Sequence, residues 1–175
     1  MEQRAAPAEL RADAAGRRLT GYAARFDVPA AIGGFTETIR PGAFAASLAS
    51  GRDVLALVDH DPARLLGRTG SGTLRLAEDA QGLAFDIALP DTQDARDLLA
   101  LADRGDLGGM SFGFRAVDQH WPARDRRELR AVDLHEISVV VGHPAYTQTS
   151  VSARARTLAR YEANARLRVI LMRTL

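Results

Sequence analysis

The stretch that decides the fold of this chain is Gly109-Met110-Ser111-Phe112-Gly113-Phe114. Side chains of a β-strand point alternately to its two faces, so Met110, Phe112 and Phe114 share one apolar face. That face is the core side. Ser111 projects from the opposite face, between two glycines that leave space for a substrate backbone. The pattern therefore predicts a strand that presents a reactive serine.

Two further stretches have the same character. In Leu134-His135-Glu136-Ile137-Ser138-Val139-Val140, the apolar side chains of Ile137 and Val139 share one face and Glu136 points to the other. The run at 54–60 reads as a strand that His60 closes. Each of the three predicted strands thus carries one reactive group.

Together these strands supply a base, His60, a nucleophile, Ser111, and a carboxylate, Glu136, which is the set that a serine hydrolase needs. Side chains that face each other on neighbouring strands lie about 4.5–5.5 Å apart at Cβ. If the three strands are neighbours in one sheet, the groups are within reach of a hydrogen-bonded relay. Backbone N–H groups would hold the oxyanion, and the turn at Val141-Gly142 is the candidate.

The rest of the chain predicts a mainly β domain with few helices. Pro62 is expected to end the histidine strand, and Gly105 is expected to end a helix that begins after Thr92. Residues 119–130 read as a charged excursion between the serine and glutamate strands. The other predicted elements are strands at 19–26 and 35–40, a short helix at 43–48, and a hairpin of 73–77 and 83–89.

Composition narrows the classes of function. Basic and acidic residues nearly cancel, leaving a formal net charge of +1, so no general attraction to nucleic acid or to a membrane is expected. There is no cysteine, which excludes a disulfide framework and a thiol nucleophile. Residues 1–15 lack the apolar run of a secretory signal, and no segment is apolar over the 18 or so residues of a membrane span.

The sequence divides into three parts. Residues 1–17 predict a flexible N-terminal arm, residues 18–150 the folded domain, and residues 151–175 a helical C-terminal tail. The tail combines helix formers with an apolar surface, so it is expected to dock on something, including a second copy of the chain in a dimer.

Other residues have alternative interpretations. Asp59 and Asp61 are expected to hold a solvated turn. A zinc site would have to gather the histidines at 60, 120, 135 and 143, but no short paired spacing typical of zinc ligands is present, and neither a metal nor an organic cofactor is expected. The arginines at 124, 126, 127 and 130 predict a solvated loop, with the binding of an acidic scaffold segment as the alternative.

Five motifs in order carry a resemblance to a known family. They lie at residues 19–26, 37–44, 59–61, 109–114 and 134–140. In this order they resemble the prohead maturation proteases of tailed bacteriophages, a family related to the herpesvirus assemblin proteases. The resemblance covers roughly residues 18 to 150, and five ordered motifs are far more specific than any one of them.

The resemblance implies a small mixed β-barrel of the assemblin type, surrounded by a few helices, and a serine nucleophile in the order His60, Ser111, third residue. Herpesvirus enzymes have a second histidine where this chain has Glu136, so His143 is the rival third member. The implied substrates are the scaffold or the scaffolding segment of the major capsid protein, cut inside an assembling procapsid in the bacterial cytoplasm. The source would be a phage, a prophage or a gene transfer particle.

Two other functions stay open. The first is an assembly factor that kept the protease fold and lost its activity, and the second is an unrelated β-barrel binding module. The distance between the Ser111 hydroxyl and the His60 ring separates them from a hydrolase. For the active enzyme, self-removal of the tail at the small residues 149–153 is a further expectation.

Overall fold

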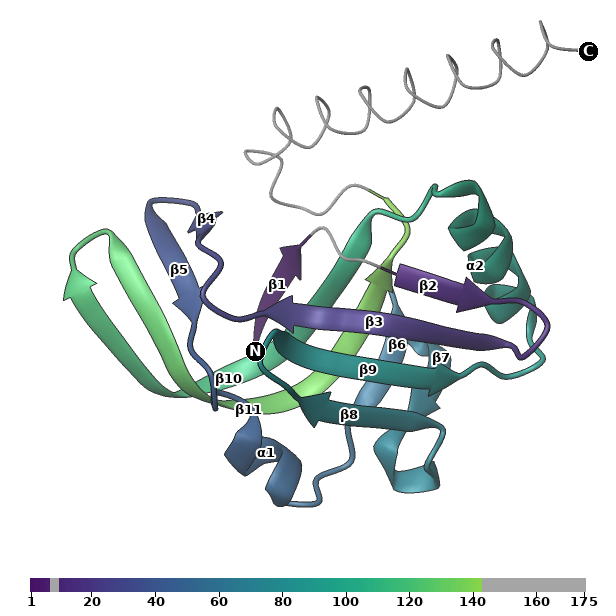
Figure 1. Ribbon diagram of the computed structural model, residues 1–175, viewed down its shortest axis with the longest axis horizontal. Coiled ribbons are helices and arrows are strands. Elements are labelled where there is room, and N and C mark those ends of the chain that lie inside the picture. The colour runs from purple at the N-terminus through teal and green to yellow at the C-terminus, as the bar shows by residue number, and fades with distance from the viewer. Residues whose placement is uncertain (7–9, 143–175) are drawn as a thin grey trace, which may run out of the picture. The chain divides into compact units, whose positions relative to one another are not determined.

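The computed structural model describes residues 1–6 and 10–142 (Figure 1). The expected helical tail at 151–175, its proposed cleavage region and His143 lie outside the described residues. The described part is mainly β, as the sequence predicts.

The strands form two sheets (Figure 1). One sheet of seven strands has the order β1 (Glu2–Ala6), β10 (Gly109–Ala123), β11 (Arg126–Val140), β5 (Phe35–Ile39), β4 (Ala30–Ile32), with β6 (Leu55–Val58) also pairing with β11 and with β7 (Asp61–Arg68). The other has the order β2 (Leu10–Asp13), β3 (Arg18–Arg25), β9 (Gly82–Ala88), β8 (Leu74–Glu78). The helices are α1 (Ala45–Ala49), α2 (Gln93–Arg104) and the 3₁₀ turn η1 (Thr69–Ser71).

The long antiparallel hairpin of β10 and β11 is the centre of the larger sheet, because the strands β1, β5 and β6 all pair with it. Each strand has 15 residues, and β11 changes partner along its length. Residues 126–129 pair in parallel with β5, whereas residues 136–139 pair in parallel with β6. The serine and glutamate strands are therefore neighbours, and the histidine strand lies next to the glutamate strand.

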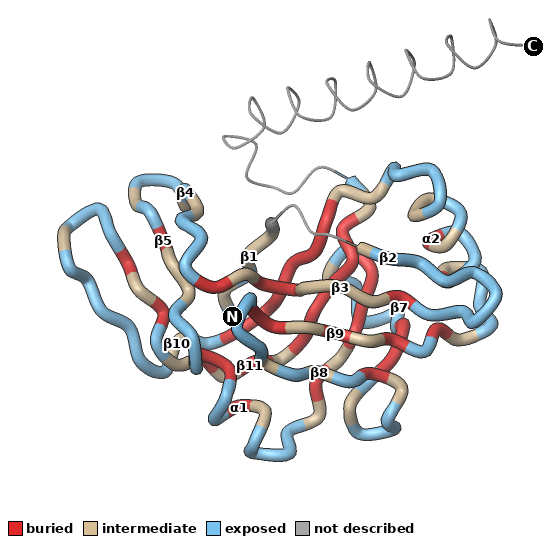
Figure 2. Tube along the Cα trace, viewed as in Figure 1, coloured by how far each residue is buried: buried red, intermediate tan, exposed pale blue. Residues whose placement is uncertain are grey.

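The core fills the space between the sheets (Figure 2). The face of β10 predicted to be apolar is buried, with Phe112 and Phe114 stacked at 5.1 Å between ring centroids. Phe44, which precedes α1, packs edge-on against Phe112 at 5.5 Å. Edge-to-face pairs add to the gain from burial, so this aromatic cluster fixes β10 against the segment that leads into α1.

Several local predictions are confirmed. β3, β5, α1 and the β8–β9 hairpin form where they were expected. α2 starts after Thr92 and ends at Gly105, whose φ of 73° is left-handed and favours glycine. No helix in the described part of the chain is long and apolar enough to cross a membrane.

The described part of residues 1–17 is not the flexible arm that was expected. Within residues 1–17, β1 and β2 are strands, each paired with a strand of the folded domain. Their short, polar, Ala- and Arg-rich sequence gives no periodic signal, because an edge strand gains its order from backbone pairing rather than from apolar side chains.

Two further expectations need correction, and the expected barrel of the assemblin type is not confirmed. Residues 119–130 are the far end of the β10–β11 hairpin and not a loop excursion. Pro62 does not end a strand, because it lies within β7, at a bulge in the pairing with β6. Among the described strands β7 pairs only with β6, and proline is tolerated at such an edge. The described strands form two sheets, and no closed barrel is found among them.

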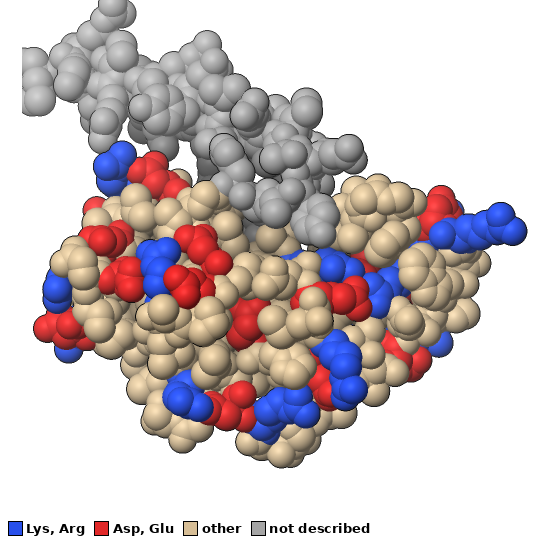
Figure 3. Space-filling model, turned by 180° about the vertical axis from the view of Figure 1, so that it is seen from behind, with Lys and Arg blue, Asp and Glu red and all other residues tan. Residues whose placement is uncertain are grey.

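The charged surface consists mainly of ion pairs. Arg side chains lie beside Asp and Glu on the face seen in Figure 3. Exposed ion pairs of the described residues include Arg18 with Asp86 and Arg68 with Asp53. Exposed pairs of this kind each contribute about 0–1 kcal/mol to stability. This interspersed pattern agrees with the near-zero net charge.

Replacement of Phe112 by alanine is expected to lower the free energy of unfolding by about 3–5 kcal/mol, because its ring is buried between Phe44 and Phe114. Chemical denaturation measures this loss. Val117→Ala is the control on the same strand, since Val117 is exposed and its truncation should change stability by no more than about 0.5 kcal/mol. Equal effects of the two changes would mean that the face assignment of β10 is wrong.

Candidate active site

His60 lies in the tight turn between β6 and β7 rather than at the end of a strand. Val58 and Asp61 face each other across the hairpin, and the two residues between them have positive φ, 49° for Asp59 and 62° for His60. Positive φ at both central positions is the geometry of a type I′ turn, which matches the twist of a hairpin. Asp and His tolerate this conformation better than most residues do.

Hydrogen bonds to β11 hold this turn in place. The Asp59 amide donates to the carbonyl of Val139 at 3.0 Å, and the Val141 amide donates to Asp59 Oδ1 at 2.9 Å. The His60 amide donates to Ser138 Oγ at 3.2 Å. The Val141 amide was a candidate for the oxyanion hole, but in this structure Asp59 already occupies it.

A β-bulge in β11 directs Glu136. Gly113 of β10 faces Glu136 and Phe114 faces Leu134, so His135 is an extra residue on the bulged strand. Leu134 and Ile137 are both in the core, although strict alternation would separate them onto opposite faces. The bulge thus lets Leu134 stay in the core while Glu136 points to the face that carries Ser111.

Glu136 contacts the imidazole through one oxygen and a serine through the other. Its Oε1 is 2.7 Å from Nδ1 of His60, and its Oε2 accepts a hydrogen bond from Ser138 Oγ at 2.6 Å. A carboxylate beside Nδ1 favours the tautomer in which Nδ1 carries the proton, which leaves Nε2 as an acceptor. This contact is the geometry of an imidazole oriented by an acid.

The space for this carboxylate depends on Gly113. A Cβ atom built at Gly113 would lie 2.2 Å from Glu136 Oε1, closer than real contacts allow. Gly113, which was expected to leave space for a substrate backbone, therefore leaves space for the Glu136 carboxylate.

Ser111 lies on the same face, one strand further along. It faces Ser138 of β11 on one side and Ala5 of β1 on the other. The Ser111 side chain is 1% exposed, and its Oγ makes no hydrogen bond. β11 lies between β10, which carries Ser111, and β6, which leads to His60. Two strand spacings place the backbones of β10 and β6 about 10 Å apart, and the side chains of Ser111 and His60 span only part of that distance. The hydrogen bond between Ser111 and His60 is therefore not formed in this structure.

Comparison with known proteins identifies the family of this chain. The family model of the caudovirus prohead serine proteases matches residues 6–164. The chain belongs to this family. No curated protein and no solved structure gives a significant match. The residues matched to the prohead serine proteases include His60, Ser111 and Glu136.

Sequence reasoning missed the part played by Ser138 in this prohead protease. Its hydroxyl is fully buried, accepts from the His60 amide and donates to Glu136, so it joins the turn to the carboxylate. The available signal was its place two residues after Glu136 on one strand face, which puts both side chains on the same side.

Other candidate residues lie elsewhere. Arg127 is buried in ion pairs with Glu2 and Glu37, contrary to the expected solvated loop, whereas Arg124 and Arg126 are exposed. In the described part of the chain, no group of three or more acidic or histidine side chains could hold a metal ion. His143 is outside that part.

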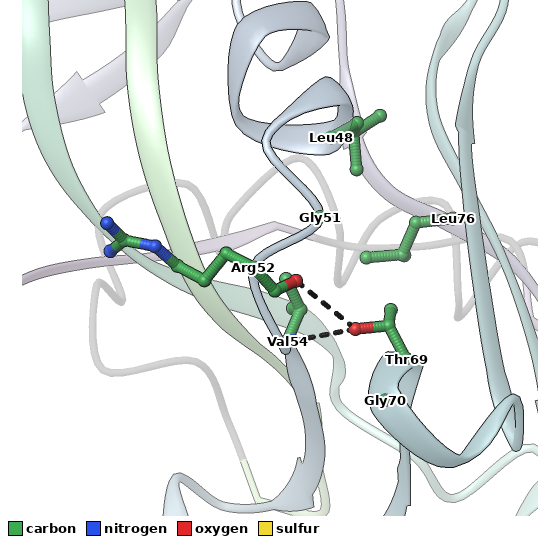
Figure 4. Close-up of a pocket in the computed structure, with 7 residues that line it drawn as sticks. All are labelled: Leu48, Gly51, Arg52, Val54, Thr69, Gly70 and Leu76. Atoms are coloured by element: carbon green, nitrogen blue, oxygen red, sulfur yellow. Dashed lines mark hydrogen bonds between the residues drawn. The ribbon is translucent and has the colours of Figure 1, made fainter.

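A small pocket of about 230 Å³ is separate from these residues (Figure 4). Leu48, Val54 and Leu76 give it apolar walls, and Arg52 directs its guanidinium away from it. Thr69 Oγ1 is already engaged there, since it accepts from the Val54 amide at 2.8 Å. The pocket contains none of the three candidate residues.

Replacement of Gly113 by alanine should reduce proteolysis about 100-fold while changing stability little. The new Cβ displaces the end of a flexible side chain, so the fold survives, but Glu136 loses its contact with His60. Cleavage of a capsid precursor and the melting temperature measure the two effects. Gly34→Ala is the matched control, because Gly34 faces open space and should alter neither. Full activity of Gly113→Ala would show that catalysis does not depend on the position of the Glu136 carboxylate.

Replacement of Ser138 by alanine is expected to lower kcat about 10- to 100-fold and to leave KM unchanged, since hydrogen bonds to a charged group contribute about 1.5–3 kcal/mol. Ser47→Ala is the control. Ser47 is also buried and accepts from the Leu134 amide of β11 at 2.9 Å, but it touches none of the candidate residues. Both variants should lose stability, and only Ser138→Ala should lose kcat. Parallel losses of kcat would make Ser138 merely structural.

Proposed function

We propose that this prohead protease is a serine endopeptidase in which His60 is the base, Ser111 the nucleophile and Glu136 the acid that orients the imidazole. The single observation that carries the proposal is the 2.7 Å contact between Glu136 and Nδ1 of His60, on the sheet face that also bears Ser111. Membership of the family supports a serine as the nucleophile.

The chemistry is peptide hydrolysis through an acyl-enzyme. Nε2 of His60 takes the proton of the Ser111 hydroxyl as its oxygen attacks the scissile carbonyl, and the imidazolium then gives that proton to the leaving amine. Glu136 stabilises the positively charged imidazolium. Water, activated by the same imidazole, hydrolyses the acyl-enzyme and regenerates Ser111.

The proposed substrates are the scaffold or the scaffolding segment of the major capsid protein, cut inside the procapsid. Self-cleavage at 149–153, which would release the tail, belongs to the same proposal. The support is the family match, since a prohead protease acts on capsid proteins.

One observation favours the alternative of an inactive assembly factor. Ser111 is buried and its hydroxyl makes no hydrogen bond, so the structure lacks the contact between nucleophile and base. Catalytic hydrogen bonds of substrate-free enzymes are often long and tighten only when substrate binds. Activity of the wild-type protein therefore separates the two functions.

Co-expression with the capsid precursor tests the proposal. Ser111→Ala and His60→Ala should abolish processing, and Glu136→Gln should slow it but leave residual activity, because an orienting acid contributes less than the nucleophile. Ser71→Ala is the control, since Ser71 is exposed and lies outside the site. Mass spectrometry of the capsid protein and of the protease itself reports both cleavage reactions.

Processing by Ser111→Ala would exclude the serine mechanism. A wild-type protein that leaves both the precursor and its own Leu175 intact would support the inactive assembly factor. Unchanged processing by Glu136→Gln would transfer the third role to His143 or to no residue.

A further inference from the structure

β1 lies at the edge of the larger sheet, beside the strand that carries Ser111. β1 pairs antiparallel with β10 and with no other described strand, and Ala5 faces Ser111 directly. On the other side of Ser111, β11 is fixed by its pairing with β6 and by the core. An extended peptide that approaches the backbone of β10 beside Ser111 must therefore take the place of β1.

The environment of Ser111 agrees with an occupied site. Its hydroxyl is buried without a hydrogen-bond partner, and burial of such a group costs about 1–3 kcal/mol. To react, a nucleophile needs a substrate carbonyl about 3 Å away. The segment that lies beside Ser111 at this edge is β1, a strand of the same chain. Addition of a strand to a free sheet edge is a common way for proteins to bind extended peptides.

Charged side chains hold β1 at this edge. On the face opposite Ser111, Arg4 Nε donates to Glu37 at 2.6 Å, and Arg127 Nη1 donates to Glu2 at 2.6 Å and to Glu37 at 2.9 Å. These four residues form the β1 ion cluster. The hydrogen bond from Arg127 lowers the pKa of Glu2, and although burial opposes it, the bonds to Glu37 and Glu2 raise the pKa of Arg4.

The same cluster permits β1 to leave. Without β1, Glu37 and Arg127 still pair with each other, so no buried charge is left alone. β1 has no large apolar side chain between Glu2 and Ala6, and Gln3 is exposed. Buried ion pairs contribute little net free energy, because desolvation offsets their attraction. Backbone pairing and this cluster are therefore the main contacts that retain the strand.

We propose that β1 occupies the substrate-binding edge of β10, and that an extended peptide reaches Ser111 by replacing residues 2–6. The peptide takes the position of β1, with an acidic side chain at Arg127, a basic side chain at Glu37 two residues later, and a small side chain opposite Ser111. This inference rests on the proposed function, since it assigns the peptide-binding site to the same serine.

The reaction of Ser111 with diisopropyl fluorophosphate tests whether β1 covers it. In the full-length protein, Arg4→Glu places a carboxylate against Glu37 and should release β1, which deuterium uptake by residues 2–6 reports. Labelling of Ser111 should then become at least tenfold faster than in the wild type. Arg11→Glu is the matched control, because Arg11 lies on β2 and is exposed, and its labelling rate should not change. If Arg4→Glu retains β1, a Gly-Ser sequence in place of residues 2–6 serves as the released form.

A fluorescent peptide with the sequence of residues 1–9 tests the occupant independently of catalysis. It should bind the released form, as measured by anisotropy, and slow the labelling of Ser111. The same peptide with Arg4→Glu should bind at least tenfold more weakly. If Ser111 is labelled at measurable and equal rates with and without β1, or if the two peptides bind equally, the inference is wrong.

The two proposals fail in different ways. If the peptide binds selectively to the released form but Ser111 never reacts, the serine mechanism fails and the binding edge stands. If Ser111 is labelled and the protein cleaves the precursor, but release of β1 changes neither the labelling rate nor the cleavage rate, the mechanism stands and the β1 proposal is wrong.

Discussion

The pairing of β10 with β11 is the constraint on which the rest of the structure depends. It brings the strand that carries Ser111 beside the strand that carries Glu136, and it sets which residues face each other. A shift of this register by one residue would send Ser111 toward the core and Phe112 away from it. The aromatic packing of Phe112 and Phe114 opposes that shift, so the core on one face fixes the chemistry on the other.

Burial of the polar face of this hairpin costs free energy, and its polar groups differ in how they are hydrogen-bonded. Glu136 is satisfied by an imidazole and a hydroxyl, and Ser138 bonds to both the turn and the carboxylate. Ser111 alone has no partner. In a network whose other members are paired, an unpaired buried hydroxyl requires an explanation, and the proposed role of Ser111 as the nucleophile provides one.

The sequence predicted those features that depend on local alternation. The apolar face of β10, the helix that ends at Gly105 and the β8–β9 hairpin follow from periodicity and turn residues, and the structure has all of them. The family was recognised from the order of five motifs, and the match over residues 6–164 confirms it. The placement of His60 at a strand end was wrong, because a type I′ turn of Asp and His lacks the usual glycine. The flexible arm expected at residues 1–17 contains strands, because an edge strand lacks an apolar pattern.

Features that depend on long-range contacts were beyond the sequence. The bulge at His135 is defined by the pairing with β10, which leaves His135 of β11 without a partner, and the sequence pattern of β11 alone predicts a regular strand. Likewise, the burial of Arg127 depends on Glu2, which is 125 positions away along the chain. Contacts across such separations leave no periodic trace in either segment.

The left-handed conformation of His60 means that activity and stability make opposing demands at this position. A residue other than glycine at positive φ costs of the order of 1 kcal/mol or more, and the hydrogen bonds from β11 hold the turn against that cost. Glycine would relieve the strain and asparagine would reduce it, but neither supplies an imidazole. A histidine at this position therefore lowers the stability of the turn, and in the proposed mechanism it supplies the imidazole that glycine and asparagine lack.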